Sequence, residues 1–92
     1  MALRMQCSFE GPFSGSGGQT VRDAQVGAYW VDSAVTRIKA RANLTPQESE
    51  QLSECARIMC DRMLDEADTV TSRGQQWSAS VGYISVTLTP AG

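Results

Sequence analysis

The sequence predicts an α+β fold in which an antiparallel helical hairpin packs on a small antiparallel sheet, in the order β-α-α-β. Three observations support this. The chain begins with alternating apolar residues, continues through two segments with helical apolar spacing, and ends in a segment rich in β-branched and aromatic residues. Because each short connection reverses the chain, the terminal strands can pair antiparallel and the hairpin can cover their apolar face.

The first predicted strand spans residues 3–10. Its apolar side chains, Leu3, Met5, Cys7 and Phe9, alternate with polar ones, which is typical of a strand with one buried face. Residues 11–19 are rich in glycine, and we expect them to form a flexible connector between this strand and the first helix.

Strand, glycine-rich segment and helix also follow one another in nucleotide-binding loops. A phosphate-binding loop places a lysine directly after its last glycine, whereas the single lysine of this chain is Lys39. The dinucleotide-binding pattern requires a further glycine where Thr20 stands. A nucleotide-binding domain or small enzyme built on this loop is therefore a minor alternative, limited to phosphate binding by amides near Gln19 and Thr20.

The first predicted helix spans residues 20–42. Its apolar residues recur at alternating steps of three and four and form one stripe: Val21, Ala24, Ala28, Val31, Val35, Ile38 and Ala42. Thr20 and Asp23 resemble a capping box at its start. Gly27 lies inside the helix, where glycine indicates either a close backbone contact or a weak point.

The second predicted helix spans residues 46–73. Thr45, Pro46 and Glu48 form a start signal, because the threonine and glutamate can cap free amides and proline is tolerated in a first turn. One face of this helix is apolar: Leu52, Ala56, Met59, Met63, Ala67 and Val70. Gly74 is expected to end the helix.

The last predicted element is a strand region at residues 76–89. The parity of its apolar residues changes at Gly82, which indicates either one strand with a β-bulge or a hairpin of two strands. A two-stranded sheet would leave two open edges, so the choice decides how much of the sheet is available to a partner.

Composition places the chain among small single domains. It has 92 residues, 41% of them hydrophobic, and a formal net charge of −2, too small to indicate a nucleic-acid mimic. Three cysteines without CxxC spacing and the absence of histidine argue against a metal site or other cofactor. Lacking a signal-peptide pattern and any long apolar run, the chain is expected to be cytoplasmic, with reduced thiols.

Catalysis has little support in the residue pattern. Without histidine, a serine or cysteine nucleophile would need another base, and none stands at a recognisable spacing. Asp61, Asp65 and Asp68 share one helix face, and a solvated acidic face is favoured over a cation site because one helix supplies too few converging oxygens. We therefore expect a non-enzymatic protein.

A surface for a partner is predicted on the first helix. Trp30, Arg37 and Arg41 lie on the side away from the apolar stripe, and Lys39 and Arg22 are neighbouring basic residues. Tryptophan and arginine are enriched at binding hot spots, and arginine binds phosphate. This pattern predicts a protein or ribonucleoprotein partner. The alternative is that this second face packs on the sheet and the arginines interact with the helix C-terminus.

In size and element order the chain resembles small phage-encoded anti-CRISPR proteins that act on type I CRISPR-Cas surveillance complexes. These are compact α+β domains without catalytic residues, and they share no sequence motif. The resemblance implies an inhibitor that docks as a monomer on the crRNA-guided complex in the host cytoplasm and blocks target DNA binding. It assigns no residue roles. The alternative function is a homo-oligomeric structural or adaptor protein that assembles through strand edges and a helix face.

Overall fold

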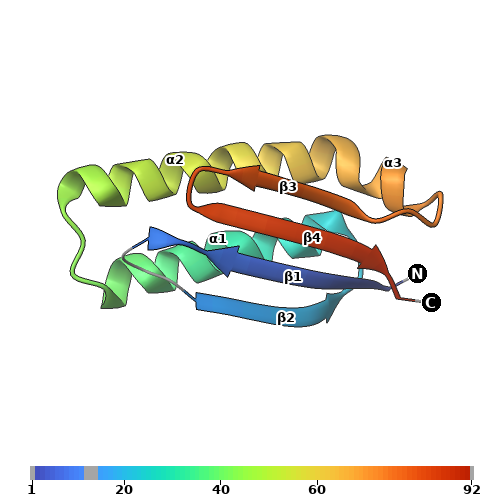
Figure 1. Cartoon of the computed structure of the whole chain (residues 1–92), viewed down its shortest axis with the longest axis horizontal. Coiled ribbons are helices and arrows are strands. Elements are labelled where there is room, and N and C mark those ends of the chain that lie inside the picture. The colour runs from blue at the N-terminus through green and yellow to red at the C-terminus, as the bar shows by residue number, and fades with distance from the viewer. Residues whose placement is uncertain (1, 12–14, 92) are drawn as a thin grey trace.

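The computed structural model describes residues 2–11 and 15–91 and has one four-stranded antiparallel sheet with helices on one face (Figure 1). The sheet order is β2-β1-β4-β3. The elements are β1 (Leu3–Phe9), β2 (Gly15–Val21), α1 (Ala24–Arg41), α2 (Pro46–Arg62), η2 (Met63–Ala67), α3 (Asp68–Thr71), β3 (Trp77–Val81) and β4 (Ile84–Pro90). The predicted α+β class with a helical hairpin on an antiparallel sheet is confirmed, and each predicted terminal strand gains a hairpin partner.

The glycine-rich segment is a strand over most of its length, so the prediction of a connector through residue 19 is wrong. β2 pairs with β1 in antiparallel register, with Gly15 opposite Phe9 and Gly17 opposite Cys7. Residues 12–14 of the predicted connector lie outside the described residues. Glycine has low strand propensity, but ladder hydrogen bonds join backbone groups only, and β1 supplies a complete set of them.

Helix α1 begins at Ala24 rather than at residue 20, because Thr20 and Val21 belong to β2. Asp23 is the N-cap, and its Oδ1 accepts a hydrogen bond from the Val26 amide at 3.0 Å. A second carboxylate, from Asp68, accepts from the Ala24 amide at 3.1 Å. The predicted capping box of Thr20 and Asp23 is therefore wrong, and one cap comes from a residue distant in sequence.

The start of α2 agrees with the sequence pattern. Thr45 Oγ1 accepts from the Glu48 amide at 3.1 Å, and Glu48 Oε1 accepts from the Thr45 amide at 2.9 Å. The predicted continuous helix to residue 73 is interrupted by the π-helical turn η2 and ends at Thr71. Buried positions after Met59 follow at steps of four, at Met63, Ala67 and Thr71. A regular α-helix would rotate this stripe by about 40° per step away from the sheet, and the wider π turn compensates for that rotation.

The C-terminal region forms a hairpin rather than one bulged strand. Val81 pairs with Ile84 across a two-residue turn at Gly82 and Tyr83. Gly82 has a φ of +55°, which glycine adopts without steric cost at the first position of a type II′ turn. A Cβ at this position would also overlap the sulfur of Cys55 on α2, so the turn is held close against the helix.

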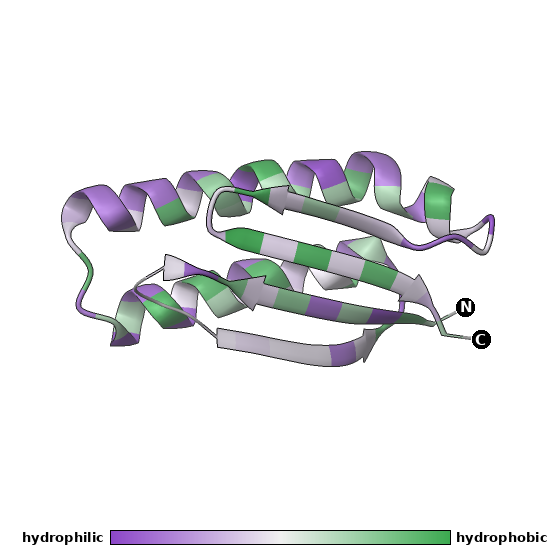
Figure 2. Cartoon of the chain, in the orientation of Figure 1, coloured by the Kyte–Doolittle hydropathy of each residue, from purple (hydrophilic) through white to green (hydrophobic). Residues whose placement is uncertain are grey.

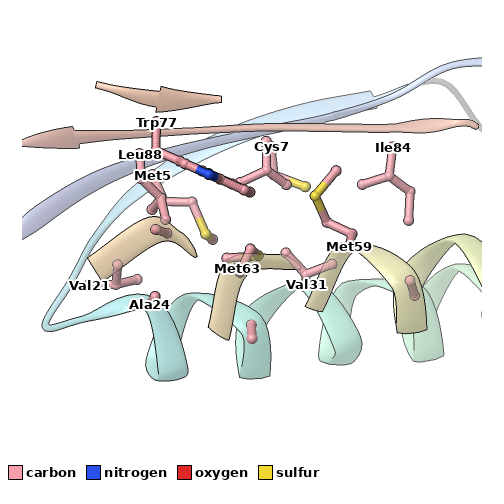
Figure 3. Packing of buried hydrophobic residues seen from close by; sticks show 14 of the residues in the cluster. Met5, Cys7, Val21, Ala24, Val31, Met59, Met63, Trp77, Ile84 and Leu88 are labelled. Carbon is pink, nitrogen blue, oxygen red and sulfur yellow. The ribbon is translucent and has the colours of Figure 1, made fainter. Parts of the chain in front are cut away.

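The core lies between the sheet and the helical hairpin. Hydrophobic and hydrophilic residues alternate along β1 and β4, whereas β2 is pale along most of its length (Figure 2). Met59, Met63 and Val31 extend from the helices toward Met5, Cys7 and Leu88 of the sheet (Figure 3). Gly27 is the predicted close contact, because a Cβ there would lie 3.0 Å from Met63 Cε and 3.3 Å from Met5 Sδ.

Replacing Asp68 with alanine tests the remote cap of α1. Loss of the bond from the Ala24 amide should lower the free energy of unfolding by about 1 kcal/mol, the usual contribution of a capping side chain. Urea denaturation followed by circular dichroism measures it. Asp65→Ala is the matched control, since Asp65 is exposed on the same helical segment. Equal losses in both variants would show that the carboxylate of Asp68 does not act as a cap.

Alanine at Gly82 tests the contact between the turn and α2. Gly74 also has positive φ, at +79°, but a Cβ there meets nothing within 4 Å, so Gly74→Ala measures the backbone cost alone, about 1–2 kcal/mol. Gly82→Ala should destabilise the protein more than Gly74→Ala. In a Cys55→Ala background, Gly82→Ala should cost less unfolding free energy than in the wild type, as measured by thermal denaturation, and an equal cost in both backgrounds would exclude the sulfur as a cause.

Candidate functional site

The structure brings two of the five predicted partner-binding residues together. Trp30 and Arg37 line one groove between α1 and β2. Arg41 is exposed one turn beyond Arg37 on the same side of the helix. Lys39 instead faces α2, where its Nζ donates to Ser53 Oγ at 2.6 Å. Arg22 lies before the helix and pairs with Asp23 at 3.1 Å.

The groove exists because β2 lacks side chains where its neighbour has large ones. Cross-strand partners in an antiparallel pair point to the same face, so Gly15 and Gly17 share the helix-facing side with Phe9 and Cys7. Among the described residues, a Cβ at either glycine would meet nothing within 4 Å. The space between the edge strand and α1 is therefore left open, with a volume of about 300 Å³.

The groove has an apolar floor and an amphipathic rim. Side chains of Met5, Cys7 and Phe9 from β1 and of Val31 and Ala34 from α1 form the floor. Trp30 is 38% exposed and packs edge-to-face with Tyr29, with ring centroids 6.1 Å apart. The alternative that this helix face packs on the sheet holds for Val26 and Ala34, which are half-buried against the core, whereas Trp30 and Arg37 reach the rim.

Arg37 supplies positive charge at the rim. Among residues 2–11 and 15–91 it has no carboxylate partner. Arg57, by contrast, pairs with Glu54 and with Asp61, the latter at 3.4 Å. An apolar floor beside an unpaired guanidinium favours a ligand that combines an apolar group with an anionic one.

The Cys7 thiol does not add a nucleophile to the groove. Burial raises its pKa from the usual 9.0 to about 11, and proximity to Cys60 contributes in the same direction. A thiol with this pKa is protonated at neutral pH, whereas reactive cysteines are thiolates. Cys7 therefore acts as an apolar part of the floor.

β2 is also an open edge of the sheet. In the described part of the chain it pairs with β1 alone. Its sequence, GSGGQTV, contains neither charge nor proline, which are the usual means of blocking further strand pairing. The groove and this free backbone lie side by side.

The alternative sites considered from the sequence lack a suitable arrangement. The amides of Gln19 and Thr20 belong to β2, opposite Met5 and Arg4, and the start of α1 is capped by carboxylates. The minor alternative of a phosphate site near residue 20 therefore lacks the free helix N-terminus on which it depended. Asp68 caps α1, and the described residues contain no cluster of acidic or cysteine side chains suited to a metal ion.

A second hollow lies between the two long helices. It has a volume of about 400 Å³ and is lined by Tyr29, Leu64 and Cys60 together with Asp32 and Asp61. Tyr29 is 67% exposed and Leu64 56%. Arg57 also lines this hollow and pairs with Asp61, so its charges are of both signs, whereas Arg37 is the charged side chain among the described residues that line the groove beside β2.

The groove was not identified from the sequence, because that required β2 to be a strand. The sequence does contain one indication of this strand: Gly15 and Gly17 are two residues apart, the same spacing as the alternating residues of β1. Because glycine has a low strand propensity, this spacing alone does not predict a strand. Trp30 and Arg37 were identified because their helical spacing is independent of the partner strand.

Comparison with protein families, curated proteins and solved structures gave no match to this chain. In the described residues, neither long helix offers a sufficiently long and apolar stretch for crossing a lipid bilayer.

Protonation of Cys7 predicts how stability depends on alkaline pH. The pKa of Cys7 in the folded protein is raised from 9.0 to about 11. The thiol therefore makes its full contribution to the free energy of unfolding below pH 9, and this contribution is lost as the pH rises to about 11. Cys7→Val, which cannot ionise, should show a smaller fall in unfolding free energy over this range, measured by urea denaturation at several pH values. Identical falls in both proteins would contradict the assigned pKa.

Proposed function

We propose that this chain is a non-enzymatic binding protein that docks on a large protein or ribonucleoprotein complex through the α1 docking face, defined as Trp30, Arg37, Arg41 and the groove beside β2. The observation that carries the proposal is the convergence on one apolar groove of Trp30 and of Arg37, which has no carboxylate partner in the described part of the chain. Aromatic and arginine side chains beside a hollow are the usual anchors of protein interfaces.

The chemistry of the groove favours binding over catalysis. Its thiol is held protonated, and the described side chains that line it include no carboxylate or imidazole that could act as a base. What the groove offers is apolar area, backbone groups and one cation, which together recognise a surface rather than transform a substrate.

The proposed partner is a type I CRISPR-Cas surveillance complex in the cytoplasm of the host cell, with the protein acting as a phage-encoded monomeric inhibitor. This part of the proposal rests on the small size and α+β class that the chain shares with such inhibitors. Occupying a protein surface or a DNA channel requires no catalytic group. Arg37 and Arg41 could contact crRNA phosphates, because guanidinium groups bind phosphate oxygens in a bidentate manner.

A homo-oligomeric adaptor is the second candidate. The open edge of β2 favours it, because an uncharged edge strand can pair with the same strand of another copy. Sedimentation velocity over a range of concentrations separates the candidates. A dimer that forms without any partner would support the adaptor, whereas a monomer that is retained by the surveillance complex would support the inhibitor.

Charge reversal at Arg37 and Arg41 tests the α1 docking face. Both side chains are exposed, so Arg37→Glu/Arg41→Glu should keep the unfolding transition while reducing retention on immobilised surveillance complex at least about tenfold. Arg4→Glu/Arg73→Glu changes net charge equally at exposed positions outside the groove and should bind like the wild type. Undiminished binding by the first variant would remove these arginines from the interface.

A further inference from the structure

We propose that the groove and the edge of β2 together bind an extended segment of the protein partner, which adds to the sheet as a fifth strand. A large apolar side chain of that segment fills the hollow at Gly15 and Gly17, and a carboxylate of the same segment pairs with Arg37. The inference rests on the proposed function, since it specifies what the α1 docking face recognises.

The outer edge of β2 presents backbone groups that an added strand can pair with. An edge strand pairs about half of its N–H and C=O groups with its neighbour and directs the others outward. β2 extends over Gly15–Val21 beside β1, and it lies at the free side of the sheet, next to α1 (Figure 1). Its glycines permit another backbone to approach closely. These groups match strand addition by a peptide.

The hollow determines which side chain the added strand carries. Alternate residues of a strand face the same side of a sheet, so every second residue of the segment would face α1. The side chains lining the hollow are mostly apolar, and its volume is about 300 Å³. This volume admits one large side chain rather than a cofactor, because it lies at the small end of ligand pockets. Phenylalanine, leucine or methionine fits this chemistry.

Arg37 determines where the added segment must carry its carboxylate. It lies two helical turns after Trp30, a separation of about 10 Å along α1. Residues two and four apart on a strand are separated by about 7 and 13 Å. A carboxylate two to four residues from the apolar side chain can therefore reach the guanidinium while the apolar side chain packs near Trp30. Pairing would satisfy an arginine that has no acidic neighbour in the described part of the chain.

A second copy of this chain does not meet these requirements. The helix-facing residues of β2 are Gly15, Gly17, Gln19 and Val21. Antiparallel pairing of two copies over the full strand would set Gln19 opposite Gly17 and Val21 opposite Gly15. Gln19 is polar and Val21 is buried in the core of its own copy, so neither supplies a large apolar side chain to the hollow. Neither edge strand, GSGGQTV or WSASV, carries a carboxylate for Arg37. The composition of these strands favours a heterologous segment over self-association.

A synthetic peptide provides the direct test. The probe is a capped peptide of about nine residues, long enough to span β2, in which threonine alternates with a central phenylalanine and with glutamate two residues to either side. Isothermal titration calorimetry on the full chain should detect binding. A peptide of the same sequence, methylated at the backbone nitrogens that face β2, should not bind, because it cannot complete the ladder.

Gly17→Leu tests the hollow, because a side chain there enters open space and would occupy the groove from within. Peptide affinity should fall at least about tenfold, equivalent to about 1.4 kcal/mol. Ser78→Leu is the control, as Ser78 is exposed on β3 at the opposite edge of the sheet and does not line the groove, and it should bind like the wild type. Gly15→Leu serves as a second blocking variant if thermal denaturation shows that Gly17→Leu is unfolded.

The outcomes separate this inference from the proposed function. Absence of peptide binding, equal binding of the methylated peptide, or unchanged binding by folded blocking variants would overturn the fifth-strand inference. If such blocking variants still retain the surveillance complex as the wild type does, docking stands without strand addition. If the peptide binds as expected but no complex is retained, the proposed partner is wrong. A dimer abolished by Gly17→Leu, with no peptide binding, would identify a second copy as the occupant.

Discussion

The structure depends above all on the pairing of β1 with neighbours on both sides. β1 contacts β2 along one edge and β4 along the other, over its whole length, so it holds the first and last parts of the chain in one sheet. Its alternate side chains, from Leu3 to Phe9, are buried against the helices. The same strand thus aligns the backbone of the sheet and supplies much of the apolar floor on which α1 and α2 pack.

The dependence of β2 on β1 explains why a groove can form beside the edge strand without loss of the core. β2 is held by backbone hydrogen bonds, which require no side chains, so glycine at Gly15 and Gly17 leaves the ladder intact while vacating the space above it. α1 then covers that space incompletely, with Trp30 and Arg37 at its margin. A glycine-rich edge strand contributes few apolar side chains to the core. Such a strand therefore requires a neighbouring strand, here β1, that supplies them.

The helical layer is joined to the sheet by contacts that fix its position closely. Asp68 reaches the first amide of α1 from the end of the second helical segment, and Gly27 lets Met63 and Met5 approach the same turn of α1. At the opposite strand connection, Gly82 lies against Cys55. Because protein interiors are close-packed, the contacts at Gly27 set the distance between α1 and the sheet, whereas the contact at Gly82 sets that between α2 and the β3–β4 turn.

The sequence by itself determined the elements whose signals are local: the alternation of β1, the capping box of Thr45 and Glu48, the helical spacing that places Trp30 and Arg37 on one side of α1. The tertiary structure alone decided the rest. Pairing with β1 turned a glycine-rich segment into β2, a distant carboxylate capped α1, and packing against the sheet required the π turn at Met63–Ala67. The physical reason is that hydrophobic period and caps act within a few residues, whereas strand pairing and cross-element contacts depend on groups far apart in the chain.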